Sequence, residues 1–193
     1  CQMNPSGSDD WRSVSASDPP LGEWTHAVGY YDHKNENLAL YVNGELRDKS
    51  FAPSPLHPTQ NAPIAIGRFE YNDPNRGLFD GTIDEVRVYK RSLNSYEIHD
   101  LYQHGTGGRD MRSLTTNKGL VGYWSLDENS GQKAYDLSGQ GNHGNLGSDQ
   151  SIQSSDPSQG SNGVLGTSAY SFDGSDDKVN LGNGTSLEAS SFT

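Results

Sequence analysis

Oxygen-bearing side chains gather in one short loop of the sequence. Asp136, Ser138 and Asn142 bring a carboxylate, a hydroxyl and an amide close together along the chain. Gly139 and Gly141 lie between them and allow the backbone to fold tightly. Calcium prefers several such oxygens, from carboxylates and from backbone and amide carbonyls. The loop predicts either a calcium site or an Asx-type turn, in which Asp136 and Asn142 bind nearby backbone N–H groups.

A second acidic cluster lies further along the chain. Asp173, Asp176 and Asp177 crowd one turn and could hold another cation. Such clusters more often cap turns in solvent, so this is the weaker candidate.

The carboxylates of a glycosidase must face one another across the substrate, one as acid and the other as nucleophile or base. Alternate residues of a strand point to the same side, whereas adjacent residues do not. Asp84 and Glu85 are adjacent, and so are Asp127 and Glu128. The six histidines show no metal-binding spacing, and no nucleophile elbow is present. We therefore expect the chain not to be an enzyme.

Exposed aromatic rings are the usual partners of sugar rings, because they combine an apolar face with a polar edge. The loop 70–77 carries Tyr71 among polar residues, although this ring could also simply cover its own loop. Trp24 and Trp124 begin or lie in expected strands and are assigned to the core. The candidate ligand-binding residues are Tyr71, Arg76, Tyr31 and Trp11.

Composition excludes several classes of function. The chain has 193 residues, with 14 lysines and arginines against 25 aspartates and glutamates, and a net charge of −11. It offers no basic surface for nucleic acid, and it contains no run of 18 apolar residues that could insert into a membrane. The single cysteine, Cys1, rules out an internal disulfide and a cysteine-based zinc site.

The pattern of apolar residues predicts short strands. Leu38, Leu40 and Val42 alternate with other residues, and Asn43-Gly44 follows as a hairpin signal. Residues 148–163 have low complexity and are expected to form a mobile surface loop. The other expected strands are 24–32, 64–67, 82–89, 119–126 and two more on either side of Asp173-Gly174.

One short helix is expected after the strand 82–89. Asn94 can cap it and Glu97 follows three residues later, as a capping box requires. Gly105 closes its end. Its apolar stripe comprises Tyr96, Ile98, Leu101 and Tyr102.

Several motifs in the chain resemble one family. The segments Trp24–Asp32, Leu40–Gly44, Ile66–Arg68 and Phe79–Tyr89 are similar to the later half of a laminin-G-like jelly-roll domain of the concanavalin A-like lectin/glucanase superfamily. The segments Gly119–Glu128, Asp136–Gly144 and Ser171–Val179 are similar to its early half. The resemblance implies an all-β fold, a two-sheet antiparallel jelly-roll sandwich with one short helix.

The two halves stand in reversed order. Residues 1–105 resemble the late half, 106–118 form a linker, and 119–193 resemble the early half. We expect the halves to pair as one sandwich, because a half-sandwich would leave bare strand edges. The chain could be a fragment that spans the junction of two tandem domains, or a circular permutant.

The ends of the sequence favour a fragment of a longer secreted or surface protein. The chain starts with Cys1, and Phe192 and Thr193 resemble the beginning of a strand. A mature bacterial lipoprotein, which also begins with cysteine, is the alternative.

The resemblance also implies a function. It suggests a structural calcium held by Asp136, Asn142 and Asp84, and an extracellular or cell-surface location. The expected function is a non-catalytic binding module whose partner is a polysaccharide or other glycan, or else an extracellular protein. A structural or adhesion spacer is the first alternative, and a glycoside hydrolase is the second.

Overall fold

Strands dominate the parts of the chain that the structure describes. The computed structural model describes residues 2–3, 12–53, 64–68, 77–106, 117–149, 151–182 and 187. The chain divides into two units. The first unit contains residues 1–58, 91–118 and 192–193, and the second contains 59–90 and 119–191. Each unit is described by itself.

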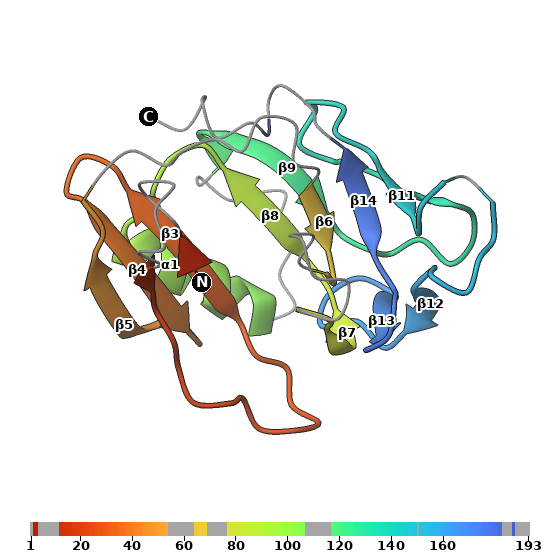
Figure 1. Ribbon diagram of the computed structural model, residues 1–193, viewed down its shortest axis with the longest axis horizontal. Coiled ribbons are helices and arrows are strands. Elements are labelled where there is room, and N and C mark those ends of the chain that lie inside the picture. Colours follow the sequence, from red (N-terminus) through yellow and green to blue (C-terminus); the bar gives the residue numbers. More distant parts are fainter. Residues whose placement is uncertain are drawn as a thin grey trace. The chain divides into compact units, whose positions relative to one another are not determined.

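The first unit combines a three-stranded sheet with a helix. In the sheet, β4 lies between β3 and β5, and both of its pairings are antiparallel (Figure 1). The short strands β1 and β2 also pair antiparallel. The elements are β1 (Gln2–Met3), β2 (Arg12–Ser13), β3 (Ala27–Asp32), β4 (Asn37–Val42), β5 (Glu45–Phe51) and α1 (Ser95–Thr106).

The Asn43-Gly44 hairpin is confirmed. Val42 pairs with Glu45, so the turn has two residues, and both have positive φ, 52° and 78°. This is the backbone of a type I′ turn, which matches the twist of the strands it joins. A Cβ atom on Gly44 would lie 3.1 Å from the Tyr102 ring and 3.2 Å from the His99 ring. The turn therefore packs against α1.

The capping box of α1 is also confirmed. The Glu97 N–H donates to Asn94 Oδ1 at 3.0 Å, and the Asn94 N–H donates to Glu97 Oε2 at 2.9 Å. Ile98 and Leu101 are buried, as expected from the stripe. The expectation for Tyr96 is wrong, because its side chain is 77% exposed. Ile98 and Leu101 lie three apart on one helix face, and Tyr96 lies away from it.

A small apolar cluster holds the start of the first unit in place. Val14, Leu38 and Ala52 are buried together, and Tyr31 packs against them. The Tyr31 hydroxyl donates to the Ala52 carbonyl at 3.3 Å. The chain segment after β2 is thereby anchored on one face of the sheet.

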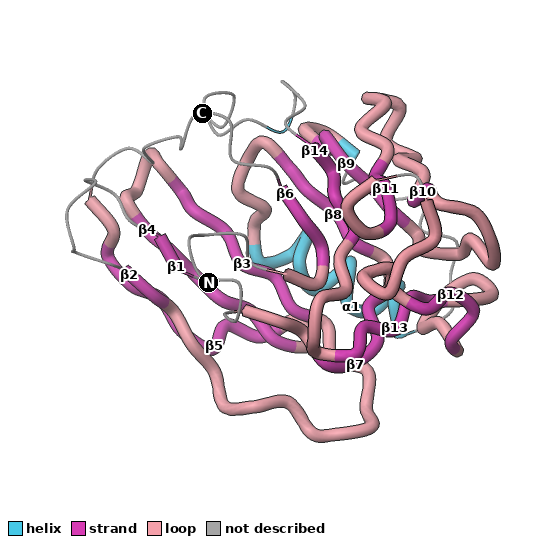
Figure 2. Tube along the Cα trace, turned by 45° about the vertical axis from the view of Figure 1, so that its right-hand side comes forward, coloured by secondary structure: helices cyan, strands magenta, loops and turns pink. Residues whose placement is uncertain are grey.

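The second unit contains the remaining strands. They form a four-stranded sheet in the order β10-β11-β14-β6, a three-stranded sheet in the order β12-β13-β7, and the pair β8-β9 (Figure 2). All the pairings are antiparallel. The strands are β6 (Ile64–Ile66), β7 (Asp80–Ile83), β8 (Val86–Tyr89), β9 (Leu120–Trp124), β10 (Lys133–Ala134), β11 (Gly144–Leu146), β12 (Ser158–Ser161), β13 (Ala169–Asp173) and β14 (Val179–Gly182).

Three of these pairings join strands that lie far apart in sequence. β6 pairs with β14, β7 with β13, and β8 with β9. In each pair, one strand comes from the part that resembles the late half and the other from the part that resembles the early half. The limits at 105 and 119, and a single sandwich built from the whole chain, stay predictions.

Two local expectations are corrected. The expected strand 82–89 is interrupted at Asp84 and Glu85, because Glu85 takes a φ of +56°, which no strand residue adopts. The segment 148–163, expected to be a loop, contributes β12, which pairs with β13 and places Gln159 opposite Tyr170.

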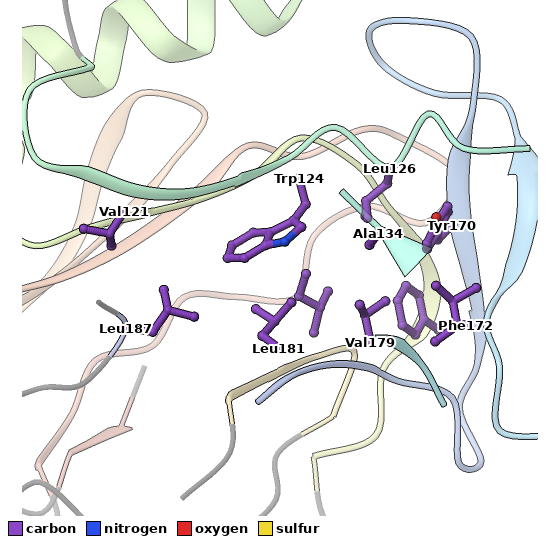
Figure 3. Packing of buried hydrophobic residues seen from close by; sticks show 11 residues of the cluster. Val121, Trp124, Leu126, Ala134, Tyr170, Phe172, Val179, Leu181 and Leu187 are labelled. Carbon is purple, nitrogen blue, oxygen red and sulfur yellow. The ribbon is translucent and has the colours of Figure 1, made fainter. Parts of the chain in front are cut away.

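The core of the second unit lies between two layers. Figure 3 shows Val121 and Trp124 of β9 on one side and Val179 and Leu181 of β14 on the other. All four belong to one buried cluster, in which Trp124 is fully buried, as expected. With several antiparallel sheets and one helix in the described residues, the all-β jelly-roll class is confirmed.

Gly44→Ala should destabilise the first unit for two reasons. An L-residue at a φ of +78° is strained by about 1–2 kcal/mol, and the added methyl group would crowd α1. Gly22→Ala is the matched control, because Gly22 has a similar φ of +76° and no atom near its Cβ position. We expect urea unfolding to show a larger loss for Gly44→Ala. Equal losses would mean that the turn gains nothing from the helix.

Candidate functional site

The loop 136–143 is organised by a single carboxylate. Asp136 Oδ1 accepts hydrogen bonds from the Tyr123 N–H at 3.0 Å and the Ser138 N–H at 2.8 Å. Its Oδ2 accepts from the Ser138 hydroxyl at 2.9 Å and the Asn142 N–H at 2.9 Å. Asp136 is only 6% exposed, so it joins a strand to both ends of the loop inside the protein.

The same loop covers the edge of β9 that is not paired with β8. The Asn142 amide donates to the Val121 carbonyl at 2.7 Å, and the Leu137 N–H donates to the Tyr123 carbonyl at 2.7 Å. The Trp124 indole N–H donates to the Asn142 carbonyl at 2.9 Å. A buried indole needs such a partner. The loop therefore supplies hydrogen bonds to the strand and to its largest side chain.

Asp84 is directed to a different loop. Its Oδ2 accepts from the backbone N–H groups of Val164 and Leu165 at 2.7 and 3.2 Å, and its Oδ1 accepts from the Glu85 N–H at 3.0 Å. Asp136 and Asn142 are brought together as the sequence suggested. The hydrogen bonds of Asp84 are made to other residues, and its membership of one ligand set with Asp136 and Asn142 stays a prediction.

A second carboxylate holds the far end of the loop that Asp84 binds. Asp127 Oδ1 accepts from the Thr167 N–H at 2.7 Å and the Ser168 N–H at 3.1 Å. Asp84 precedes β8 and Asp127 follows β9, and Val86 pairs with Trp124, so both carboxylates lie at the same end of this strand pair.

These bonds decide how well the residues fit calcium. An ionised carboxylate offers about four lone-pair positions. The four hydrogen bonds to Asp136 use them all, and each donor directs positive charge at the oxygens where a cation would sit. The carboxylate of Asp136 does not fit a calcium ion in this arrangement. The geometry is that of the alternative expectation, an Asx-type turn.

Two opposing effects set the pKa of Asp136. Burial would raise the pKa, but the hydrogen bonds from Ser138, Tyr123 and Asn142 outweigh it and hold the pKa below the usual value. The stability that the carboxylate adds is present above the pKa of an aspartate in the unfolded chain. It is lost as the pH falls through the lower pKa of the folded state.

Glu85 belongs to a separate buried cluster beside β8 and β9. Its carboxylate pairs with the Arg87 guanidinium at 3.1 Å and accepts the Tyr123 hydroxyl at 3.0 Å. The guanidinium also lies over the Tyr123 ring, 4.1 Å from its centroid. The side chains of Glu85 and Arg87 are only 10% and 9% exposed.

Burial raises the pKa of Glu85 to about 7. Arg87 and Tyr123 act in the opposite direction, whereas the charges of Asp84 and Asp127 add to the increase. A carboxyl group with such a pKa resembles a catalytic acid in this respect.

Comparison with known proteins identifies the family. Residues 2–99 match the family model described as the concanavalin A-like lectin/glucanases superfamily. The chain belongs to this superfamily. No curated protein and no solved structure matches the chain.

The superfamily includes sugar-binding proteins and glycoside hydrolases, and laminin-G-like domains within it are generally non-catalytic and extracellular. In the described residues, no helix has the length and apolarity needed to cross a membrane.

The ligand-binding residues expected from the sequence are only partly visible. Trp11, Tyr71 and Arg76 lie outside the described residues. Tyr31 is described and partly buried against the apolar cluster of the first unit, and its part in ligand binding stays a prediction. The expectation that Trp24 is a core residue is wrong, because it is 42% exposed. Trp24 follows a proline- and glycine-bearing segment without alternation, a signal that favoured a loop.

The acidic cluster of the second candidate is present. Ligand oxygens of Asp173, Asp176 and Asp177 lie within 4.8 Å of one another. Asp177 accepts the Asp173 N–H at 2.8 Å, and Asp173 accepts the Ser175 N–H at 2.8 Å, so two of the carboxylates cap the turn.

Asp136→Ala should lower the free energy of unfolding by about 3 kcal/mol or more, because several buried N–H groups lose their acceptor. Asp149→Ala is the control, since Asp149 accepts similar local bonds from Ser151 and Gln153 on the surface. We expect a much smaller loss there, because water can replace hydrogen bonds made on the surface. Urea unfolding with calcium or with a chelator should give the same values. Stabilisation of the wild type by calcium, abolished in Asp136→Ala, would contradict the turn.

Glu85→Gln should change how stability depends on pH. A raised pKa means that Glu85 favours the folded state at low pH, and that this contribution is lost as the pH rises from about 4.5 to about 7. The wild type should therefore lose stability relative to Glu85→Gln between pH 5 and pH 8. Melting temperatures measure this difference, and Glu45→Gln at an exposed position controls for the change of charge. A difference that stays constant with pH would show that Glu85 titrates normally.

Proposed function

We propose that this chain is a non-catalytic, extracellular module that binds glycans. The observation that carries the proposal is the match of residues 2–99 to a superfamily named for its lectins and glucanases. Lectins bind glycans, whereas glucanases hydrolyse them. In the described residues, the hydrogen bonds that the carboxylates already accept favour binding over hydrolysis.

Two acidic residues at one end of the β8–β9 pair already form hydrogen bonds within the protein. Asp84 and Asp127 each accept backbone N–H groups of the loop 163–168. A glycosidase needs one carboxylate to protonate the leaving oxygen and another to attack or to activate water. Carboxylates that hold a loop together are not free for either role.

The exposure of Trp24 is a second, independent observation in favour of glycan binding. An indole that is 42% exposed presents an apolar face to solvent, and such a face can stack on the C–H groups of a sugar ring. Phe51 is more exposed, at 61%, but it lacks a polar edge.

A glycoside hydrolase is the second candidate, and Glu85 is the observation that favours it. Its pKa of about 7 suits a general acid. Against this, its carboxylate is already paired with Arg87 and Tyr123, and its side chain is 10% exposed.

A glycan array probed with the whole chain tests the proposal. We expect the wild type to bind, Trp24→Ala to lose most of the signal and Phe51→Ala to retain it, because the indole has a polar edge beside its apolar face and the Phe51 ring does not. Incubation with soluble glucans and galactans should release no product. Silence of the wild type across the array would favour an adhesion spacer, and product release abolished by Glu85→Gln would favour the hydrolase.

A further inference from the structure

The four-stranded sheet of the second unit has one face in the core and one face turned away from it (Figure 2). Ala134 of β10, Leu146 of β11 and Val179 of β14 are buried in the core cluster. Successive side chains of a strand point to opposite faces, so the residues that alternate with these lie together on the other side. This outer face carries Lys133, Tyr135, His143, Asn145 and Asn180.

The register of the strands places these side chains beside one another. Lys133 pairs with Asn145, and Asn145 pairs with Asn180, so three polar side chains form a row across three strands. Tyr135 directly follows β10 and His143 directly precedes β11. Their rings meet edge to face, with centroids 5.4 Å apart. An aromatic pair therefore lies next to the polar row.

The aromatic pair is exposed and yet held in place. Tyr135 is 50% exposed, and His143 is also exposed. The Tyr135 N–H donates to Glu128 Oε1 at 2.8 Å, and the Asp136 N–H donates to His143 Nδ1 at 3.0 Å. The pair is thus positioned before any ligand arrives, which lowers the entropy cost of binding. An exposed tyrosine ring offers an apolar face and a polar hydroxyl, the combination that suits a sugar ring.

The polar groups that this face offers to a ligand are mainly donors. Because His143 Nδ1 accepts the Asp136 N–H, the neutral ring carries its proton on Nε2. Asn180 Oδ1 accepts the Gly182 N–H at 2.9 Å, which leaves the NH₂ group of the amide. Lys133 is exposed, and it forms no ion pair within the described residues. A ligand group that only accepts hydrogen bonds and is negatively charged complements these donors.

We propose that the outer face binds an acidic sugar residue of a glycan, whose ring stacks on Tyr135 and whose carboxylate or sulfate group pairs with Lys133. The inference rests on the proposed function and adds a site and a class of sugar. Residues two apart on a strand lie about 6.6 Å apart, so one sugar residue can contact both side chains. The net charge of −11 opposes the approach of an anion, but physiological salt screens exposed charges beyond about 8 Å.

Two substitutions on the outer face test the two contacts. Lys133→Gln removes the charge, and Tyr135→Ala removes the ring but keeps the N–H that Glu128 accepts. The matched controls are Lys49→Gln at an exposed position of β5 and Tyr96→Ala at a 77% exposed position of α1. All four variants should melt close to the wild type, because the substituted side chains are exposed.

A glycan array that displays uronate-bearing, sulfated and neutral glycans, probed over a dilution series, measures binding. We expect the wild type and both controls to bind at least one acidic glycan. Lys133→Gln and Tyr135→Ala should bind it about tenfold more weakly, because each loses one direct contact to the ligand. The class of acidic glycan that is bound identifies the anionic group as carboxylate or sulfate.

The other outcomes separate this site from the proposed function. Equal binding of acidic glycans by all variants would overturn the site and leave glycan binding intact. Binding of neutral glycans alone would overturn the acidic class. A loss in Lys133→Gln without a loss in Tyr135→Ala would overturn recognition of the sugar ring. Silence of the wild type on every glycan would overturn the proposed function and this site with it.

Discussion

The buried carboxylate of Asp136 is the interaction on which the second unit depends. It accepts hydrogen bonds from β9 and from both ends of the loop 136–143, and so holds that loop along the free edge of β9. Without this cover, the strand would present unpaired backbone groups, and the Trp124 indole would lose its partner. The largest side chain of the core is thus positioned by a polar loop as well as by apolar packing.

Carboxylates also accept backbone hydrogen bonds at one end of the β8–β9 pair. Asp84 and Asp127 hold the two ends of the loop 163–168 through backbone N–H groups. Part of the acidic excess of the chain therefore serves as hydrogen-bond acceptors within the fold. Because these carboxylates are already hydrogen-bonded, we expect neither calcium binding by Asp136 nor catalysis by the pair Asp84 and Asp127.

Features that depend on local chemistry could be predicted from the sequence, and features set by distant contacts could not. The Asn43-Gly44 turn and the Asn94 cap follow from the residues themselves, and both are confirmed. The break at Glu85 could not be foreseen, because its backbone conformation accompanies the binding of Asp84 to a loop some 80 residues away.

The central claim is that hydrogen bonds to Asp136, and not a metal ion, hold the loop on β9. Amide hydrogen exchange of Tyr123 and Asn142, whose N–H groups both donate to this carboxylate, tests it most directly. We expect slow exchange at both amides, at the same rate with calcium and with a chelator. Slow exchange that appears only when calcium is added would contradict it.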